Sequence, residues 1–228
     1  MEEKDSKKLW LEFEQEYIPK SNFSLGPYTT QGYLEDPACH AFMTSRYKFC
    51  SRMLSDLGEV LEIGCGDGFG GAIVSQKVGK LLCTDINAPL LKDNEQRMSN
   101  FPNIAYSYHD FRSAPHERKF DAIYLVDVIE HIFTHEENRF LENICLSLKD
   151  NGICLIGTPN KTAEKFASKF SKEAHVNLKD EGGMRTIGKT FFENSFLFGM
   201  NDEIVHTGYP AMSHYLWIMC VGPKRKVN

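Results

Sequence analysis

Five glycines fall within the short stretch Val60-Leu-Glu-Ile-Gly-Cys-Gly-Asp-Gly-Phe-Gly-Gly71. The stretch follows an apolar run and precedes a helical pattern, which is the context that a nucleotide-binding turn needs. Glycine lets the backbone turn sharply there and lets a ligand approach it closely. Asp85 ends the next apolar run, about 20 residues further on, where a carboxylate can accept hydrogen bonds from both ribose hydroxyls. The pattern therefore predicts a site for a ribose-containing ligand.

Two classes of ligand fit this loop. The spacing from Gly66 to Gly71 satisfies G-x-G-x-x-G, so a nicotinamide-dependent oxidoreductase is one alternative. Glu62, however, stands two residues before the first glycine, where its carboxylate can neutralise or orient a cationic amino-acid group. S-adenosylmethionine carries such a group and has no diphosphate to cradle, so these features favour it over a dinucleotide.

Several acidic and histidine side chains could assist a reaction. His131 follows the apolar run at 122–126, and a histidine titrates near neutral pH, which suits a general base. Asp127, Glu130 and His131 have i, i+3, i+4 spacing, which places them on one face if a helix begins there. Carboxylates with an imidazole suit Mg²⁺ or Mn²⁺. The other candidate bases are His175 and His206, in the C-terminal third.

Short apolar runs alternate with segments of helical length after residue 58, at 60–63, 81–84, 104–108, 122–126 and 153–156. Such alternation predicts a parallel sheet with helices on both faces. Two last runs, at 203–206 and 215–221, are too close for a helical crossover and are expected to pair antiparallel. Residues 1–57 are expected to form a helical cap, with a helix at 38–54 and a turn-rich loop at 25–33 that is either a lid or a plain connection.

Size and charge limit the function further. The chain has 228 residues, 42% apolar and 25% charged, as expected for a globular protein. Its formal net charge of −5 argues against a nucleic-acid partner, which needs a basic face. The sequence has neither a signal-peptide pattern at its start nor a run of about 20 apolar residues, so we expect a cytoplasmic protein that acts without a membrane.

Five segments in order make the region from 60 to about 160 resemble the core of class I S-adenosylmethionine-dependent methyltransferases. They are Glu62-Ile-Gly-Cys-Gly-Asp-Gly68, Thr84-Asp-Ile-Asn87, His109-Asp-Phe111, Phe120-Asp-Ala-Ile-Tyr-Leu-Val-Asp-Val-Ile-Glu-His-Ile132 and Leu148-Lys-Asp-Asn-Gly-Ile-Cys-Leu-Ile-Gly-Thr-Pro-Asn160. The resemblance implies a Rossmann-like, seven-stranded, mostly parallel α/β sheet with a C-terminal antiparallel pair. Residues 58–228 would form this domain, with a substrate-covering insertion at about 160–200.

The same resemblance implies roles for single residues. Gly64, Gly66 and Gly68 would line the amino-acid and ribose end of the ligand, with Asp85 on the ribose and Ile86 against adenine. The further ligand contacts implied by the resemblance are the Asp110 carboxylate and the Phe111 backbone N–H at adenine, and Val126 and Asp127 beside the sulfonium.

The cluster of Asp127, Glu130 and His131 is similar to the metal site of small-RNA 2′-O-methyltransferases and of some quinone-precursor O-methyltransferases. By that resemblance His175 would be a further ligand, although Asp127 stands where those enzymes carry glutamate. A metal-assisted RNA 2′-O-methyltransferase is therefore an alternative function, opposed by the acidic charge.

The C-terminal third resembles a subgroup linked to bacterial surface-polysaccharide biosynthesis, through segments such as His175-Val-Asn-Leu178 and His206-Thr-Gly-Tyr-Pro210. This resemblance implies a small acceptor of sugar, nucleotide-linked or phosphate type, including phosphoramidate intermediates of capsule assembly. The histidines of this region favour oxygen as the methylated atom, and nitrogen remains an alternative.

Overall fold

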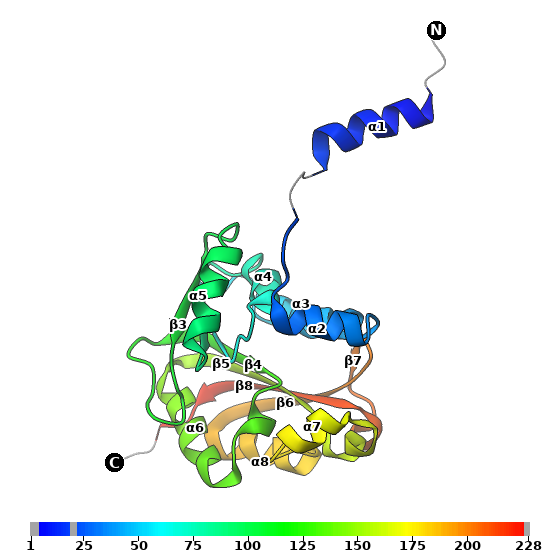
Figure 1. Ribbon diagram of the computed structural model, residues 1–228. Helices are drawn as coiled ribbons and strands as arrows, with labels where there is room; N and C mark the ends of the chain where they lie inside the picture. The colour runs from blue at the N-terminus through cyan, green and yellow to red at the C-terminus, as the bar shows by residue number, and fades with distance from the viewer. Residues whose placement is uncertain (1–4, 19–21, 226–228) are drawn as a thin grey trace.

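The computed structural model describes residues 5–18 and 22–225, and in this part of the chain it forms an eight-stranded sheet of order β3-β2-β1-β4-β5-β8-β6-β7 (Figure 1). The strands are β1 (Glu59–Ile63), β2 (Lys80–Asp85), β3 (Ile104–Tyr108), β4 (Phe120–Val126), β5 (Leu148–Pro159), β6 (Phe192–Asn201), β7 (Ile204–His206) and β8 (Tyr215–Pro223). The predicted α/β class is confirmed, and the sheet has one strand more than the seven predicted.

The first five strands are parallel, and their pairing places β1 between β2 and β4. Helices cover both faces of this half, so its central strands are buried and nearly continuous in apolar residues. In β4 every residue except Asp121 is buried. The chain leaves β1 toward β2 on one side and later returns to β4 on the other. A crevice forms at such a switch point, at the carboxyl ends of the strands.

The C-terminal strands pair differently from the prediction. Residues 203–206 were expected beside 215–221, but β6 lies between them, antiparallel to both β8 and β7. The sequence of β6 has phenylalanine at positions 192, 196 and 198 and was expected to be helix and loop. These side chains face the sheet's own neighbours, because β6 pairs with β8 over most of its length.

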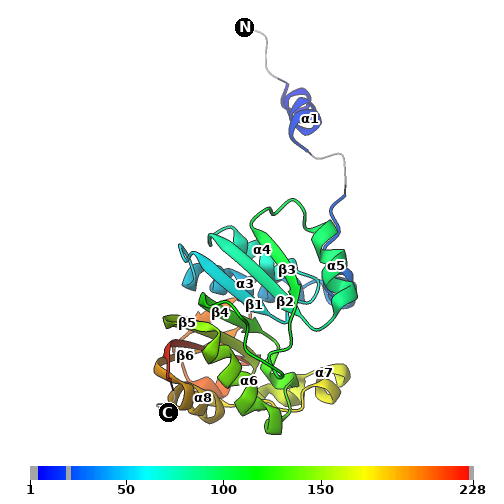
Figure 2. The ribbon, with the colours of Figure 1, turned by 90° about the vertical axis from the view of Figure 1, so that its left-hand side faces the viewer.

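Figure 2 shows helices on opposite sides of the sheet, with α3, α4 and α5 on one face and α6 and α8 on the other. The helices and 3₁₀ turns are α1 (Ser6–Tyr17), α2 (Pro27–Glu35), α3 (Cys39–Met53), α4 (Phe69–Ser75), α5 (Ala88–Arg97), η1 (Ile129–His131), α6 (Thr134–Leu146), η2 (Lys161–Phe166), α7 (Lys169–Ala174), α8 (Glu181–Phe191) and η3 (Pro210–Met212). The helix predicted at 38–54 is α3.

The segment 25–33 was expected to be a loop, and most of it is α2 instead. Pro27 occupies the first turn of α2, where its missing N–H has no intrahelical partner to lose and its fixed φ suits the helix. The turn-forming residues of this segment therefore start a helix rather than interrupt the chain.

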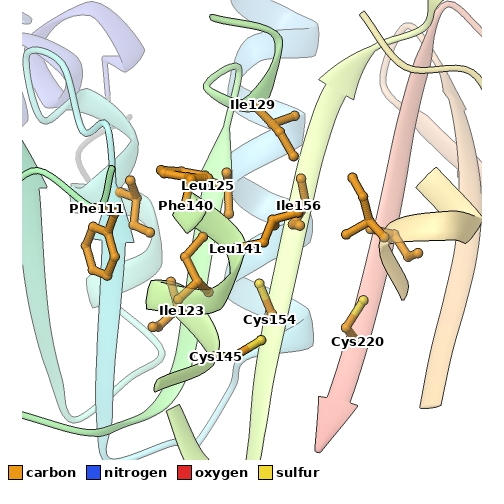
Figure 3. Packing of buried hydrophobic residues seen from close by; sticks show 14 of the residues in the cluster. Phe111, Ile123, Leu125, Ile129, Phe140, Leu141, Cys145, Cys154, Ile156 and Cys220 are labelled. Carbon is orange, nitrogen blue, oxygen red and sulfur yellow. The ribbon is translucent and has the colours of Figure 1, made fainter. Parts of the chain in front are cut away.

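The main core lies under α6 and α8. Figure 3 shows Phe140 and Leu141 of α6 packed toward Ile123 and Leu125 of β4. A second cluster on the other face joins Cys50 of α3 to β1, β2 and β4. The sheet is therefore clamped from both faces around β4, the strand that leads into the candidate site.

Helix α1 stands apart from the rest of the protein (Figure 1), and none of its residues is buried. Its rings stack on one another, with centroid separations of 5.6 Å for Trp10–Phe13 and 4.6 Å for Phe13–Tyr17. Among the described residues, no helix combines the length and the apolar character that crossing a bilayer requires. The division into a cap at 1–57 and a domain at 58–228 remains a prediction.

Helix α6 offers a matched test of the core. Leu141 is 0% exposed in the main cluster, whereas Leu146 on the same helix is 51% exposed. We expect Leu141→Ala to lower the free energy of unfolding by about 2–5 kcal/mol, because it removes buried methyl groups and leaves a cavity. Leu146→Ala should change it by only about 0.5 kcal/mol. Urea denaturation measures both, and equal losses would contradict this description of the core.

Candidate active site

The glycine loop after β1 adopts a backbone that other residues rarely tolerate. Gly64, Gly66 and Gly68 have φ values of 71°, 52° and 73°, in the left-handed region. A Cβ at Gly64 would also lie only 2.5 Å from the Cγ2 atom of Val128. Helix α5 holds the loop from outside, since Asn94 Nδ2 donates to the Gly66 carbonyl at 2.7 Å. The loop is a rigid, open backbone surface.

Asp85 at the end of β2 lies against this loop. One carboxylate oxygen accepts a hydrogen bond from Gly66 N at 3.0 Å and the other accepts one from Asn87 N at 2.9 Å. These two backbone donors fix the carboxylate, which keeps further lone pairs for ligand hydroxyls. The next side chain, Ile86, is apolar and 56% exposed, so it offers an open surface to a flat ring.

Glu62 lies beneath the loop and is 1% exposed. Its carboxylate accepts a hydrogen bond from the Cys83 thiol at 3.2 Å. Burial raises the pKa of Glu62 to about 7, because the charged form loses its hydration. A cationic group bound nearby would favour the charged carboxylate, so this residue can respond to a positively charged ligand.

The residues predicted at the adenine end occupy different environments. The Arg112 guanidinium, 3.0 Å from the carboxylate of Asp110, lowers the pKa of Asp110 and keeps it ionised. The Phe111 side chain is 2% exposed in the main core, which leaves its backbone as the part available to a ligand. Val126 ends β4 and is buried in the other cluster.

The start of α2 is joined to the glycine loop. The backbone N–H of Thr29 donates to one carboxylate oxygen of Asp67 at 2.7 Å, and its hydroxyl donates to the other at 2.9 Å. The ring of Tyr28 lies over Gly66, 3.5 Å from where a Cβ would stand. A cavity of about 880 Å³ lies between α2 and α5. The predicted lid segment thus covers the glycine loop.

Asp127, directly after β4, has a φ of 56°, which is strained for a residue with a Cβ. Its backbone N–H donates to the Gly157 carbonyl at 3.1 Å. Its carboxylate forms an ion pair of 2.6 Å with Nη1 of Arg46 from α3. Sequence reasoning missed Arg46, which lies 81 positions earlier, and its one signal was a cation within an amphipathic helix.

Glu130 in η1 is 0% exposed, and one of its carboxylate oxygens accepts a hydrogen bond from the Thr158 hydroxyl at 3.0 Å. Burial, and then the nearby Asp127 carboxylate, raise the pKa of Glu130 to about 8. The side chain therefore holds its proton at neutral pH.

His131 and His175 meet beside Glu130, with ring centroids 5.1 Å apart. His131 Nδ1 lies 3.0 Å from the Ala174 carbonyl. A carbonyl can only accept, so Nδ1 carries the hydrogen and Nε2 keeps a lone pair. Burial, and then His131, lower the pKa of His175, so this ring is neutral at pH 7. Each histidine can therefore accept a proton.

The metal candidates are only partly brought together. Ligand atoms of Glu130, His131 and His175 lie within 4.8 Å of one another, whereas Asp127 is outside this group. Asp127 was expected on one helical face with the others, but its left-handed backbone precedes the short η1 turn, and its carboxylate is paired with Arg46. The remaining donors, one carboxyl and two imidazoles, suit a divalent cation only after Glu130 loses its proton.

His206 lies in β7, where its Nδ1 accepts a hydrogen bond from Gly208 N at 3.0 Å. Within the described residues no printed contact joins it to Asp127 or His131. His214 instead lines a cavity of about 290 Å³ with Arg46, Asn160 and His175. The structure thus gathers two of the three predicted histidines and adds His214 and Arg46.

Comparison with known proteins gives a family match for residues 60–152, to a model described as a methyltransferase domain. Among curated proteins, the ubiquinone biosynthesis O-methyltransferase of Bradyrhizobium diazoefficiens is 28% identical over 144 residues, which cover 60% of this chain and 52% of that protein. The chain spans about half the length of the curated relatives it matches.

Two solved structures share the fold. The methyltransferase domain of bacterial-CtHen1-C has a TM-score of 0.66 and 13% identity, with 79% of this chain and 99% of that chain covered. The N-methyltransferase NodS from Bradyrhizobium japonicum WM9, in complex with S-adenosyl-l-homocysteine, has a TM-score of 0.60 and 15% identity, with coverages of 80% and 86%. At these identities the likeness shows the fold alone, and it confirms the predicted Rossmann-like architecture.

The raised pKa of Glu62 predicts a pH-dependent stability. A glutamate in the unfolded chain has a pKa of about 4.3, while the native pKa is about 7, so the native state holds the proton more tightly. The stabilisation is present at low pH and is lost as pH rises through 7, by up to about 3 kcal/mol.

Glu62→Gln keeps an oxygen for the Cys83 thiol but does not titrate. We expect urea denaturation at pH 5 and pH 8 to show a smaller loss of stability for the variant than for the wild type. Glu95→Gln on exposed α5 should behave like the wild type. Identical pH dependence in Glu62→Gln and wild type would show that Glu62 is already charged.

Proposed function

Residues 60–152 form a class I S-adenosylmethionine-dependent methyltransferase domain, and from this premise we propose that the protein transfers a methyl group from S-adenosylmethionine to an oxygen atom of a small polar acceptor. The observation that carries the proposal is the Asp85 carboxylate, held by Gly66 N against a loop of left-handed glycines at the switch point of the sheet. That arrangement offers a ribose acceptor and an open backbone side by side.

The ligand contacts follow from the same edge of the sheet. Asp85 would accept from the ribose hydroxyls, Ile86 would pack on adenine, and Glu62 would face the amino-acid end. Asp110 and the Phe111 backbone would meet the adenine edge. Val126 and Asp127, at the end of β4, would stand beside the methyl group to be transferred.

Bound S-adenosylmethionine supplies a methyl group on a sulfonium leaving group, so the protein's own task is to orient the acceptor and to take its proton. His131 Nε2 and His175 are neutral nitrogens suited to that task. As the new C–O bond forms and the S–C bond breaks, the hydroxyl proton passes to one of these histidines, which returns it to solvent after the product leaves.

The acceptor is proposed to be a sugar, a nucleotide-linked molecule or a phosphate-type intermediate of surface-polysaccharide assembly. The resemblance of the C-terminal third supports this class, and the cavity of about 290 Å³ beside Asp127 has room for a small molecule. The net charge of −5 supports a reaction without nucleic acid, in the cytoplasm.

A second candidate is metal-assisted transfer, as in the RNA 2′-O-methyltransferase alternative. The grouping of Glu130, His131 and His175 within 4.8 Å favours it. These three side chains would hold Mg²⁺ or Mn²⁺, which would lower the pKa of a bound hydroxyl. The protonated state of Glu130 at neutral pH opposes it, because a carboxyl must lose its proton to bind a metal. The nicotinamide-dependent alternative is opposed by the family match.

The first prediction concerns Asp85. Asp85→Asn keeps an acceptor for Gly66 N but removes the charge and one acceptor site, so we expect S-adenosylhomocysteine to bind at least about tenfold more weakly, a loss of about 1.4 kcal/mol. Isothermal titration calorimetry measures the affinity, and Glu95→Gln should match the wild type. The proposal fails if the wild type is stabilised against heat by NADH and not by S-adenosylhomocysteine.

The second prediction separates the two candidates. Enzyme dialysed against EDTA should keep its methyl-transfer rate, and added Mn²⁺ should not raise it. The profile of kcat/KM against pH should lose activity on the acid side only below about pH 6.5, because burial lowers the pKa of His175 and keeps the ring neutral there. A rate that collapses in EDTA and returns with Mn²⁺, but does not return in Glu130→Gln, would establish the metal-assisted route instead.

A further inference from the structure

Arg46 is a buried cation whose hydrogen-bonding groups are only partly used. Its side chain is 11% exposed, and Nη1 forms the ion pair with Asp127. Its Nε–H is buried and has no partner among the described residues. Buried N–H groups in folded proteins nearly always have an acceptor, so a buried N–H without one calls for a ligand.

The orientation of the Arg46 guanidinium is set by the rings around it. The group lies 3.9 Å above the centroid of the Tyr215 ring and 5.5 Å from that of Phe42. Asp127 occupies Nη1, which leaves the edge formed by Nε and Nη2. That edge is a planar fork of two parallel donors, whose geometry matches the two oxygens of a carboxylate or phosphate.

The cavity in which Arg46 lies presents further donors. His175 and His214 both line it, and burial lowers the pKa of each, so each is a neutral ring that can donate one N–H. Asn160 also lines it, but its amide already donates to the Pro210 and Ser213 carbonyls. The free donors thus come from Arg46 and the two histidines.

Two exposed carboxylates, Glu164 and Asp202, line the same cavity. They would repel an anion at the rim and would accept hydrogen bonds from hydroxyl groups there. Asp127 has a buried carboxylate oxygen without a partner, which is a further acceptor for a hydroxyl. The cavity therefore selects a small molecule with an anionic group at one end and hydroxyl groups elsewhere.

We propose that Arg46 binds an oxyanion group of the acceptor, a phosphate or a carboxylate, through its Nε–Nη2 edge. This inference rests on the proposed methyl transfer and narrows its substrate class to anionic, hydroxyl-bearing small molecules. Because Arg46 also holds Asp127 at the end of β4, an anion on Arg46 brings the rest of the acceptor to the strand end where the methyl group is expected. Binding of a non-reacting group then positions the hydroxyl that reacts.

The test is calorimetric titration of the full chain, saturated with S-adenosylhomocysteine, at about 0.15 M salt to screen loose surface binding. The three probes are glycerol 3-phosphate, glycerate and glycerol, which share hydroxyl groups and differ in the anion. We expect one of the two anions to bind at least tenfold more tightly than glycerol. The stronger of them identifies phosphate or carboxylate as the group recognised.

Arg46→Lys retains a cation for Asp127 but lacks the two-donor edge, so it should lose at least tenfold in affinity for the preferred anion. Arg52→Lys is the matched control, because Arg52 is exposed on the same helix and outside this cavity, and it should bind like the wild type. Affinity for S-adenosylhomocysteine should be equal in all three proteins. Circular dichroism checks that the variants are folded.

Equal anion affinity in Arg46→Lys and wild type would overturn the proposal, and would leave Arg46 with the role of holding Asp127. So would a wild type that binds neither anion more tightly than glycerol, an outcome that needs no variant. Wild-type protein that binds an anion through Arg46 but does not bind S-adenosylhomocysteine would refute the proposed methyl transfer and retain the anion site.

Discussion

The pairing of β1 with β4 is the constraint on which the rest of the site depends. These strands are far apart in the chain, with β2 and β3 between them, yet they are neighbours in the sheet. The connection out of β1 and the connection into β4 therefore run to opposite sides, and the strand ends between them are left uncovered. The glycine loop, Asp85 and Asp127 all lie at this edge. A ligand placed there meets backbone from one strand end and carboxylates from the other two.

Burial at this edge decides which carboxyl groups carry charge. Asp127 stays beside a cation, since its ion pair with Arg46 compensates the loss of hydration. Glu130 has only the Thr158 hydroxyl as partner, and Glu62 has only the Cys83 thiol, so the pKa of each rises toward or above neutrality. The same residue type thus supplies a fixed anion at one position and proton-holding groups at two others. A bound cation at either of these two would restore the charged form.

Sequence reasoning predicted the glycine loop and Asp85 because their signals are local. The loop is continuous in the chain, and each acidic residue follows directly after an apolar run that forms a strand. The Arg46 pair, the Thr29–Asp67 contact and the β6–β8 pairing depend on segments far apart in the sequence, which periodicity cannot join. The i, i+3, i+4 spacing misplaced Asp127 because it assumed a helix, whereas the backbone at Asp127 is left-handed and only a short 3₁₀ turn follows. The phenylalanines of β6 were assigned to a capping core because no turn residues separated them from the preceding helical pattern.

The two halves of the crevice are built in different ways, and this bears on how acceptor chemistry diverges among related proteins. The loop and strand ends from β1 to β4 come from one contiguous region, 60–126, which falls within the family match. The cavity beside Asp127 is assembled from α3, η2, the turn after α7 and the start of β8, all of them outside residues 60–152. Changes in these segments leave the loop and Asp85 untouched, so acceptor choice can change while the ligand loop is retained. Proteins named as an O-methyltransferase and an N-methyltransferase both resemble this chain, as expected if the shared part is the loop and the strand ends. Arg46 belongs to the variable half but contacts Asp127 of the shared half, so it is the side chain through which the acceptor's identity can reach the reacting centre.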